Sequence, residues 1–164
     1  MELFPEYTSL TKSSPPLPLA ARMRPDSLEK YFGQEHLIGK GLPLRELVET
    51  ESGLSFILWG PPGSGKTTLA RIAAKLTESV FHEISAVNAG VADIRKVVQS
   101  ATQIWKAKGS RTILFLDEIH RFNKVQQDAI LPFVENGTIR LIGSTTENPS
   151  FEVIPALPSR CQIF

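Results

Sequence analysis

Residues 60–67 read Gly60-Pro61-Pro62-Gly63-Ser64-Gly65-Lys66-Thr67 and match the phosphate-binding pattern G-x-x-x-x-G-K-[ST]. The glycines allow backbone N–H groups to curl around an anionic phosphate chain without Cβ clashes. Lys66 is expected to reach the β- and γ-phosphates, and the Thr67 hydroxyl is expected to hold Mg²⁺. The pattern therefore predicts a site for a nucleoside triphosphate and Mg²⁺, with nucleotide-binding residues running from Gly60 to Thr68.

The segments on either side of this loop support the prediction. Residues 55–59 are mostly apolar and predict a buried strand, while residues 66–77 have the spacing of an amphipathic helix. A strand, a glycine-rich loop and a helix in this order aim a helix N-terminus at phosphate. The alternative is a chance Gly/Pro-rich turn, which would require neither the preceding strand nor the following helix.

The composition is that of an ordinary globular chain. The 164 residues are 41% hydrophobic and 21% charged, and the formal net charge is +1, so any polyanion would have to bind at a local patch. A single cysteine, Cys161, suits a reducing compartment and predicts a cytosolic protein. No apolar run approaches the roughly 18 residues of a membrane span, so no membrane association is expected.

The rest of the chain divides into an arm and a core. Residues 1–18 carry four prolines and predict a flexible arm, and residues 19–164 are expected to form one α/β core. Beyond the first strand and helix, strands are predicted at 80–84, 112–116 and 139–143, and helices at 91–106 and 124–134. Repeated strand–helix units predict a parallel sheet covered by helices on both faces. Residues 161–164 read as the start of a further strand, so the chain is expected to stop inside a larger architecture.

Two acids follow the apolar strand 113–116. Asp117 is expected to hold Mg²⁺, and Glu118 is expected to polarise the water that attacks the γ-phosphate. Both would emerge at the carboxyl end of a strand, where open α/β sheets bind ligands. The plainer alternative is a strand that ends in solvated carboxylates. The acid pair favours hydrolysis over phosphate transfer to a substrate hydroxyl, which leaves a small-molecule kinase as a distant alternative.

Two further positions are ambiguous on spacing alone. Thr145 and Thr146 follow the 139–143 strand and would lie beside the acid pair, where one could touch the γ-phosphate or orient water. A polar turn is an equally good interpretation, and Asn148-Pro149 favours it. Arg160 lies after a proline-rich turn, where an arginine is usually a solvated surface residue.

In order along the chain, the loop at 60–67, the run 117–122 and the run 159–161 resemble an AAA+ ATPase of the clamp-loader clade. Residues 143–151, Gly-Ser-Thr-Thr-Glu-Asn-Pro-Ser-Phe, together with 117–123 and 18–25, look like the replication-associated recombination protein A family, bacterial relatives of Werner-helicase-interacting protein. The resemblance covers roughly residues 18–164. It implies a P-loop NTPase fold that binds ATP.

The resemblance also implies residue roles. Thr146 takes the place of the sensor-1 residue, with Asn148 as a second candidate, and Arg160 takes that of the arginine finger that enters a neighbouring subunit's site. Residues 19–25 and 31–34 resemble the segment that cradles adenine and ribose. Ser85 aligns with the polar switch residue, where clamp loaders usually have Asn.

The function implied by the family is a DNA-dependent ATPase that maintains replication forks and acts in DNA repair and recombination. The implied partners are DNA, further copies of the chain (a tetramer in the full-length protein) and single-stranded-DNA-binding protein, in the bacterial cytoplasm near the nucleoid. Family members continue into a helical lid with a sensor-2 arginine and a C-terminal oligomerisation region, and this sequence stops before both.

Local support for DNA contact lies around the predicted helix 91–106 and its exit. Five positive charges surround Trp105 there: Arg95, Lys96, Lys106, Lys108 and Arg111. The alternative is a solvated helix face with Trp105 in the core. No recognition-helix or zinc pattern occurs, so gaps, ends or fork junctions are expected rather than base-specific sites.

Two other functions stay open. One is a clamp loader or a Holliday-junction branch-migration ATPase, against which the stretch 145–151 argues. The other is a nucleotide-binding interaction module without useful catalysis.

Overall fold

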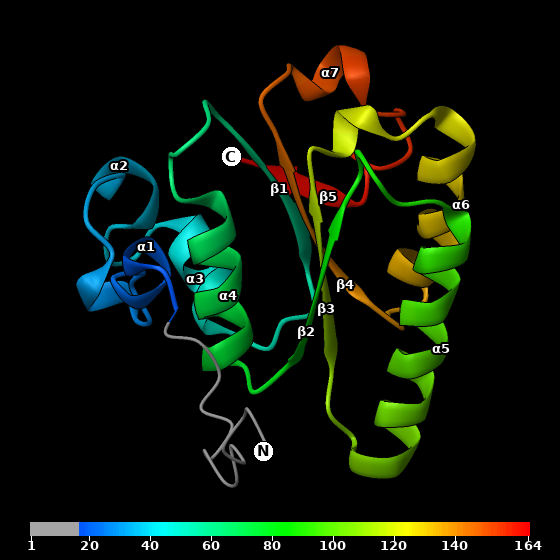
Figure 1. Cartoon of the computed structure of the whole chain (residues 1–164), viewed down its shortest axis with the longest axis horizontal. Helices are drawn as coiled ribbons and strands as arrows, with labels where there is room; N and C mark the ends of the chain where they lie inside the picture. Colours follow the sequence, from blue (N-terminus) through cyan, green and yellow to red (C-terminus); the bar gives the residue numbers. More distant parts are fainter. Residues whose placement is uncertain (1–16) are drawn as a thin grey trace, which may run out of the picture.

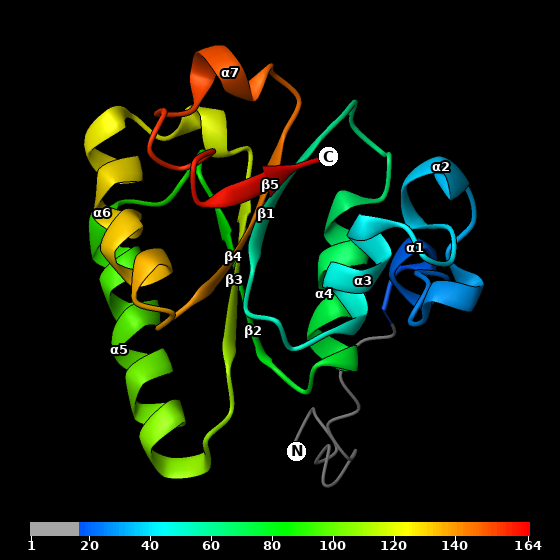
Figure 2. The same ribbon diagram turned by 180° about the vertical axis from the view of Figure 1, so that it is seen from behind.

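Residues 17–164 are described by a computed structural model, shown in Figures 1 and 2. Residues 1–16 of the predicted arm lie outside the described residues. Among the described residues, no helix is long and apolar enough to cross a membrane.

Five parallel strands form one sheet. They are β1 (Ser55–Trp59), β2 (Val80–Ser85), β3 (Thr112–Asp117), β4 (Arg140–Thr145) and β5 (Cys161–Ile163), in the spatial order β2-β3-β4-β1-β5. The predicted parallel α/β fold is confirmed. Since all strands run the same way, their carboxyl ends meet at one edge, which lies at the top of Figure 1.

Helices cover both faces of the sheet, as Figures 1 and 2 show. On one face lie α3 (Pro43–Glu49) and α4 (Lys66–Leu76), and on the other lie α5 (Val91–Lys108) and α6 (Lys124–Glu135). Shorter elements complete the chain: α1 (Leu19–Arg22), the 3₁₀ turns η1 (Leu28–Lys30) and η2 (Ile119–Arg121), α2 (Glu35–Ile38) and α7 (Pro149–Glu152). The long helices match the predicted ranges to within two residues, whereas α1 and α2 were not predicted, because single helical turns carry no clear apolar period.

The buried strands are apolar on both faces. In β3, Ile113 and Phe115 pack toward α4, and Leu114 and Leu116 pack toward α5 and α6. This is the pattern of a strand covered on both sides. One prediction for β1 is wrong in part: residues 55–58 are buried, but the Trp59 side chain is 49% exposed because the strand ends there, beside a surface pocket.

A buried guanidinium ties β4 to the helical face. Arg140 is 5% exposed and donates hydrogen bonds to three backbone carbonyls at the end of α3 and after it, those of Leu47 (2.5 Å), Thr50 (3.3 Å) and Leu54 (2.8 Å). Burial, helped by the nearby charge of Arg111, lowers the pKa of Arg140 to about 10. The side chain therefore satisfies carbonyls that would otherwise be buried without a partner.

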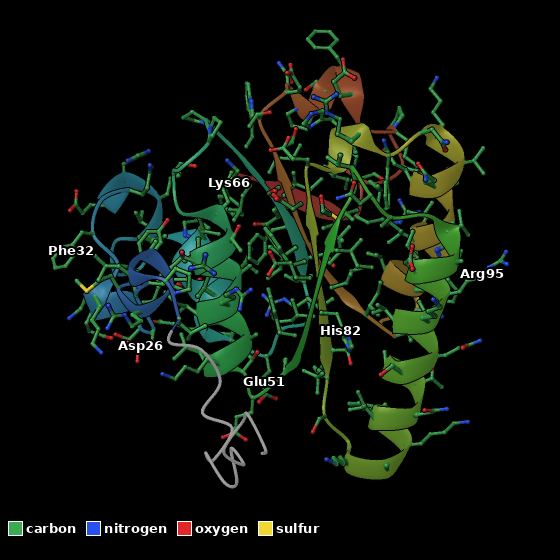
Figure 3. The ribbon with its side chains drawn as sticks, in the orientation of Figure 1. Asp26, Phe32, Glu51, Lys66, His82 and Arg95 are labelled. Atoms are coloured by element: carbon green, nitrogen blue, oxygen red, sulfur yellow. The ribbon has the colours of Figure 1, made fainter. Side chains whose placement is uncertain are left out.

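Replacing Arg140 with Ala should lower the free energy of unfolding by about 3 kcal/mol, because three carbonyls lose a charged donor together. Urea unfolding measures this. The matched control is Arg95→Ala, since the Arg95 side chain projects away from α5 in Figure 3. The control should change stability by no more than about 0.5 kcal/mol. Equal losses in the two variants would contradict the assigned role of Arg140.

Candidate nucleotide site

The loop between β1 and α4 leaves backbone donors free at a helix N-terminus. Gly65 caps α4 at φ +89°, and Gly63 adopts φ +76°, a conformation that suits glycine. The first helical hydrogen bond runs from Leu69 N–H to the Gly65 carbonyl. The amides of Lys66, Thr67 and Thr68 therefore have no helical acceptor and are available to an anion.

Lys66 lies folded against its own loop. Its Nζ donates to the carbonyls of Gly60 (2.7 Å) and Pro61 (2.8 Å), and to Ser64 Oγ (3.3 Å). Partial burial lowers the pKa of Lys66, while the carboxylates of Glu118 and Asp117 act in the opposite direction. The ammonium group is thus held at the mouth of the loop within the field of the acid pair.

At the end of β3, Asp117 is anchored by the neighbouring strand. Ser144 Oγ, fully buried in β4, donates to Asp117 Oδ1 at 2.5 Å and accepts the backbone N–H of Glu118 at 3.2 Å. One hydroxyl therefore fixes both residues of the acid pair. The second carboxylate oxygen of Asp117 has no hydrogen-bond partner among residues 17–164 and could bind a cation.

Glu118 adopts a left-handed backbone conformation, φ +56° and ψ +50°, which a non-glycine residue reaches only at a cost. The kink turns its side chain toward the end of β4. There Oε2 accepts a hydrogen bond from Thr146 Oγ1 (3.3 Å) and lies 3.2 Å from His120 Nε2. Within the described chain Oε1 has no such partner, so it is free to accept a proton from water.

His120 holds this arrangement from behind. The imidazole is 7% exposed, and its Nδ1 lies 3.0 Å from Thr145 Oγ1. The ring therefore lies between the Glu118 carboxylate and the Thr145 hydroxyl, whose own proton is donated to the Glu147 carbonyl at 3.0 Å. Glu118 is therefore braced by groups from η2 and from the end of β4.

These groups face one open cleft of about 350 Å³. Its lining combines the loop residues Pro62–Thr68 with Asp117, Glu118 and Arg24. The donor set suits a polyphosphate: backbone amides, Lys66 and Arg24 are complementary to its charge. Thr67 and Asp117 offer the hydroxyl and carboxylate oxygens that Mg²⁺ takes beside phosphate oxygens. The residues present thus fit ATP and Mg²⁺.

A second pocket, of about 160 Å³, adjoins the loop and suits a flat ring. Tyr31 donates from its hydroxyl to the Ser64 carbonyl (3.1 Å), and a Cβ at Gly65 would collide with the Tyr31 ring. Apolar groups close the pocket, among them Leu37, Ile38 and Leu58. Of the stretches expected to cradle adenine and ribose, Tyr31 and Gln34 line this pocket, whereas Phe32 is exposed and residues 19–25 do not line it.

Three predicted residues lie elsewhere or have other contacts. Arg160 does not line the phosphate cleft of its own chain and instead pairs with Glu135 Oε1 at 3.0 Å. Asn148 is the N-cap of α7 and accepts the Ser150 N–H at 3.0 Å. Ser85 ends β2 in register with Asp117. Among the sensor candidates, Thr146 is the one that contacts Glu118.

Sequence reasoning missed Ser144 and His120 and expected Arg24 at a different part of the nucleotide site. A serine inside the apolar run 141–144 was the available signal for Ser144, because a buried hydroxyl needs a partner. His120 lies in the run 117–122 that carries the family resemblance, but no role was predicted for it. Arg24 belongs to the stretch 19–25 that the resemblance assigned to adenine and ribose, whereas the structure places it beside the phosphate loop.

The comparisons with known proteins agree with this geometry. The family model described as "ATPase family associated with various cellular activities (AAA)" matches residues 56–164. The chain belongs to the AAA family of ATPases. The family accounts for a nucleotide-binding site built on this loop.

The curated relatives confirm the resemblance to replication-associated recombination protein A. Proteins of that name are 55% identical in Escherichia coli and 57% identical in Coxiella burnetii, each over 90% of this chain and 33% of the relative. An "ATPase WRNIP1" from Dictyostelium discoideum is 47% identical over the whole chain and 19% of its own length. The chain therefore spans about a third of the bacterial relatives that it matches.

Among solved structures, the Thermotoga maritima RuvB Holliday junction branch migration motor superposes with a TM-score of 0.69 at 31% identity. The match covers 86% of this chain and 47% of RuvB. The predicted P-loop AAA+ fold is confirmed.

Ser144→Ala should destabilise the fold by about 1–3 kcal/mol, because the Glu118 N–H and an oxygen of Asp117 lose their buried partner. It should also weaken Mg²⁺-dependent nucleotide binding by about 10- to 100-fold, as the loss of a group that orients a metal ligand does. Chemical unfolding and calorimetric titration with ATP·Mg²⁺ measure the two effects.

Ser150→Ala is the matched control, because Ser150 is exposed on α7 and its hydroxyl has no hydrogen bond among the described residues. Wild-type Mg²⁺ dependence in Ser144→Ala would show that Ser144 does not orient Asp117.

Proposed function

We propose that this chain is the ATP-hydrolysing core of a DNA-dependent ATPase that acts at replication forks, in repair and in recombination. The observation that carries the proposal is the placement of Glu118: it follows the cation-binding candidate Asp117, lines the same cleft as Lys66, and keeps Oε1 free. A group so placed suits a base that activates water rather than a residue that only binds nucleotide.

Each residue has a distinct part in the proposed reaction. The loop amides and Lys66 hold the β- and γ-phosphates, after the ammonium group leaves the carbonyls of Gly60 and Pro61. Bound Mg²⁺ supplies neutralisation of the charge that develops on the phosphates. Thr67 and Asp117 are its proposed ligands. Glu118 Oε1 accepts a hydrogen bond from the attacking water, and Thr146 aligns Glu118 with the γ-phosphate.

Arg160 is proposed to act in a neighbouring copy. Its guanidinium is half-exposed on the surface, and among residues 17–164 it pairs only with Glu135 and Ser159, two contacts that solvent weakens. An arginine supplied from outside can stabilise transition-state charge by several powers of ten. The proposal therefore includes a homo-oligomer, with a tetramer as the proposed form of the full-length protein.

DNA is the proposed effector. The exposed side of α5 and its exit carry Arg95, Lys96, Lys106, Lys108 and Arg111. Surface cations attract the phosphate backbone without reading sequence, which suits gaps, ends and fork junctions. Single-stranded-DNA-binding protein is a further proposed partner, and the bacterial nucleoid the proposed location.

A branch-migration motor is the second candidate, favoured by the RuvB superposition. The identities favour the first candidate, because RuvB is about 30% identical and the proteins named for replication-associated recombination are 44–57% identical over a similar share of this chain.

Glu118→Gln should bind ATP·Mg²⁺ with near wild-type affinity and hydrolyse it about 10²- to 10⁴-fold more slowly, because the amide cannot accept the proton. Steady-state phosphate release with and without forked DNA measures this. Glu51→Gln, at the opposite end of the sheet in Figure 3, should leave turnover unchanged. Wild-type turnover in Glu118→Gln would remove Glu118 from its role. ATP binding without turnover in the wild-type chain, whatever the DNA, would support the interaction-module alternative.

Arg160→Ala should bind ATP but lose turnover by about 10³-fold or more if the arginine acts between copies. Mixing it with Lys66→Ala, itself inactive, should restore part of the activity, because a mixed pair contains one intact loop next to one intact arginine. Titrating one variant into the other while following phosphate release measures the rescue. No rescue at any ratio would contradict the shared site.

A further inference from the structure

The nucleotide site is not the only cleft that combines charge with an aromatic ring. A cavity of about 370 Å³ lies at the opposite edge of the sheet, where the last turn of α5 meets the start of β3 and the turn between α6 and β4. Its lining includes Trp105 and Arg111. Figure 1 shows the last turn of α5 and the start of β3 at the bottom of the view, away from the phosphate loop.

Trp105 is exposed, although one interpretation of the sequence placed it in the core. Its side chain is 56% exposed, although Ala101, one turn earlier in α5, is 1% exposed. The alternative that placed Trp105 in the core is therefore wrong. A large aromatic face left open to solvent beside a cleft is available to a ligand with a flat ring.

The charges around the cleft are uncompensated. Arg111 lines the cleft, and Lys108 follows Trp105 by three residues, on the same side of α5. Both are exposed, and neither forms an ion pair within residues 17–164. Arg111 also lowers the pKa of Arg140 beneath it, so the local field is positive. A ligand with several negative charges is therefore favoured.

The far wall offers hydrogen-bond groups at a fixed position. Asn136 Oδ1 accepts from both the N–H (2.9 Å) and the hydroxyl (2.6 Å) of Thr138, which rigidifies the turn. The Asn136 amide nitrogen and the Ser110 hydroxyl have no hydrogen bond to residues 17–164 and line the cleft. Such groups can meet the polar edge of a base stacked on Trp105.

We infer that this cleft binds single-stranded nucleic acid, with one base stacked on the indole of Trp105 and the adjoining phosphates held by Lys108 and Arg111. Aromatic platforms flanked by cations are how proteins hold single strands without sequence preference. A duplex keeps its bases stacked on one another and could use only the cations. The inference rests on the proposal that the protein acts on DNA, and it adds the strandedness and the place of contact.

The test uses a fluorescently labelled oligothymidylate of about ten nucleotides, within the usual site sizes for single strands. Fluorescence anisotropy should give an affinity for Trp105→Ala about 5- to 140-fold weaker than for the wild type, the range expected for one stacked base. Trp105→Phe, which keeps a ring, should lose less. An abasic oligomer of equal length should bind the wild type about as weakly as oligothymidylate binds Trp105→Ala.

Phe151→Ala is the matched control, because this ring is 83% exposed on α7 at the other end of the sheet. It should bind oligothymidylate as the wild type does. Lys108→Ala should reduce the slope of log affinity against log salt by about 0.7, the value for one lost single-strand phosphate contact. The melting temperature of each variant checks that folding is intact.

Equal affinity of wild type and Trp105→Ala, equal binding of the abasic and normal oligomers, or no binding by the wild type would each overturn the inference. Failure here is distinguishable from failure of the proposed function. If DNA still stimulates turnover in Trp105→Ala, the DNA that stimulates turnover binds at another site. If oligothymidylate binds at the cleft but no DNA stimulates turnover, the cleft remains a nucleic-acid site and the proposed DNA-dependent ATPase is contradicted.

Discussion

Parallel pairing of β1, β4 and β3 determines where every group of the candidate site lies. Trp59 pairs with Thr145, and Leu116 pairs with Gly143, so the phosphate loop, Ser144 and Asp117 all emerge at one edge of the sheet. A shift of one residue in either pairing would turn Ser144 to the opposite face and leave Asp117 without its hydroxyl donor. The apolar residues on both faces of these strands resist such a shift, since it would expose part of the core.

Within that frame, the site combines a rigid half and a movable half. Ser144, His120 and Thr146 brace the acid pair through buried or half-buried contacts from β4 and η2. Lys66, in contrast, rests on carbonyls of its own loop, contacts that a phosphate oxygen can replace. The strained backbone of Glu118 belongs to the rigid half, where neighbouring contacts can offset its cost.

The sequence was sufficient for the fold and for bringing the phosphate loop and the acid pair to one edge of the sheet, because these depend on local patterns. The loop at 60–67 and the acids at 117–118 follow apolar strands, and a parallel sheet must bring such ends together. Arg140 and Gln127 were not predictable in the same way. Each reads locally as an ordinary strand or helix residue, yet each is buried and joins distant backbone: Arg140 to residues 47–54, and Gln127 to Phe122, Glu152 and Ile154. Exposure of Trp105 likewise follows from packing that periodicity does not specify.

The central claim is that one edge of this sheet binds ATP·Mg²⁺ with Lys66 on the phosphates and Glu118 free to activate water. A crystal structure of the chain with Mg²⁺ and a non-hydrolysable ATP analogue tests it most directly. The account predicts that Lys66 Nζ leaves the carbonyls of Gly60 and Pro61 for the β- and γ-phosphates, that Thr67 and Asp117 share the metal, and that Glu118 keeps its contacts with His120 and Thr146. Nucleotide bound with Lys66 still on its own loop, or with Glu118 turned away from the γ-phosphate, would contradict it.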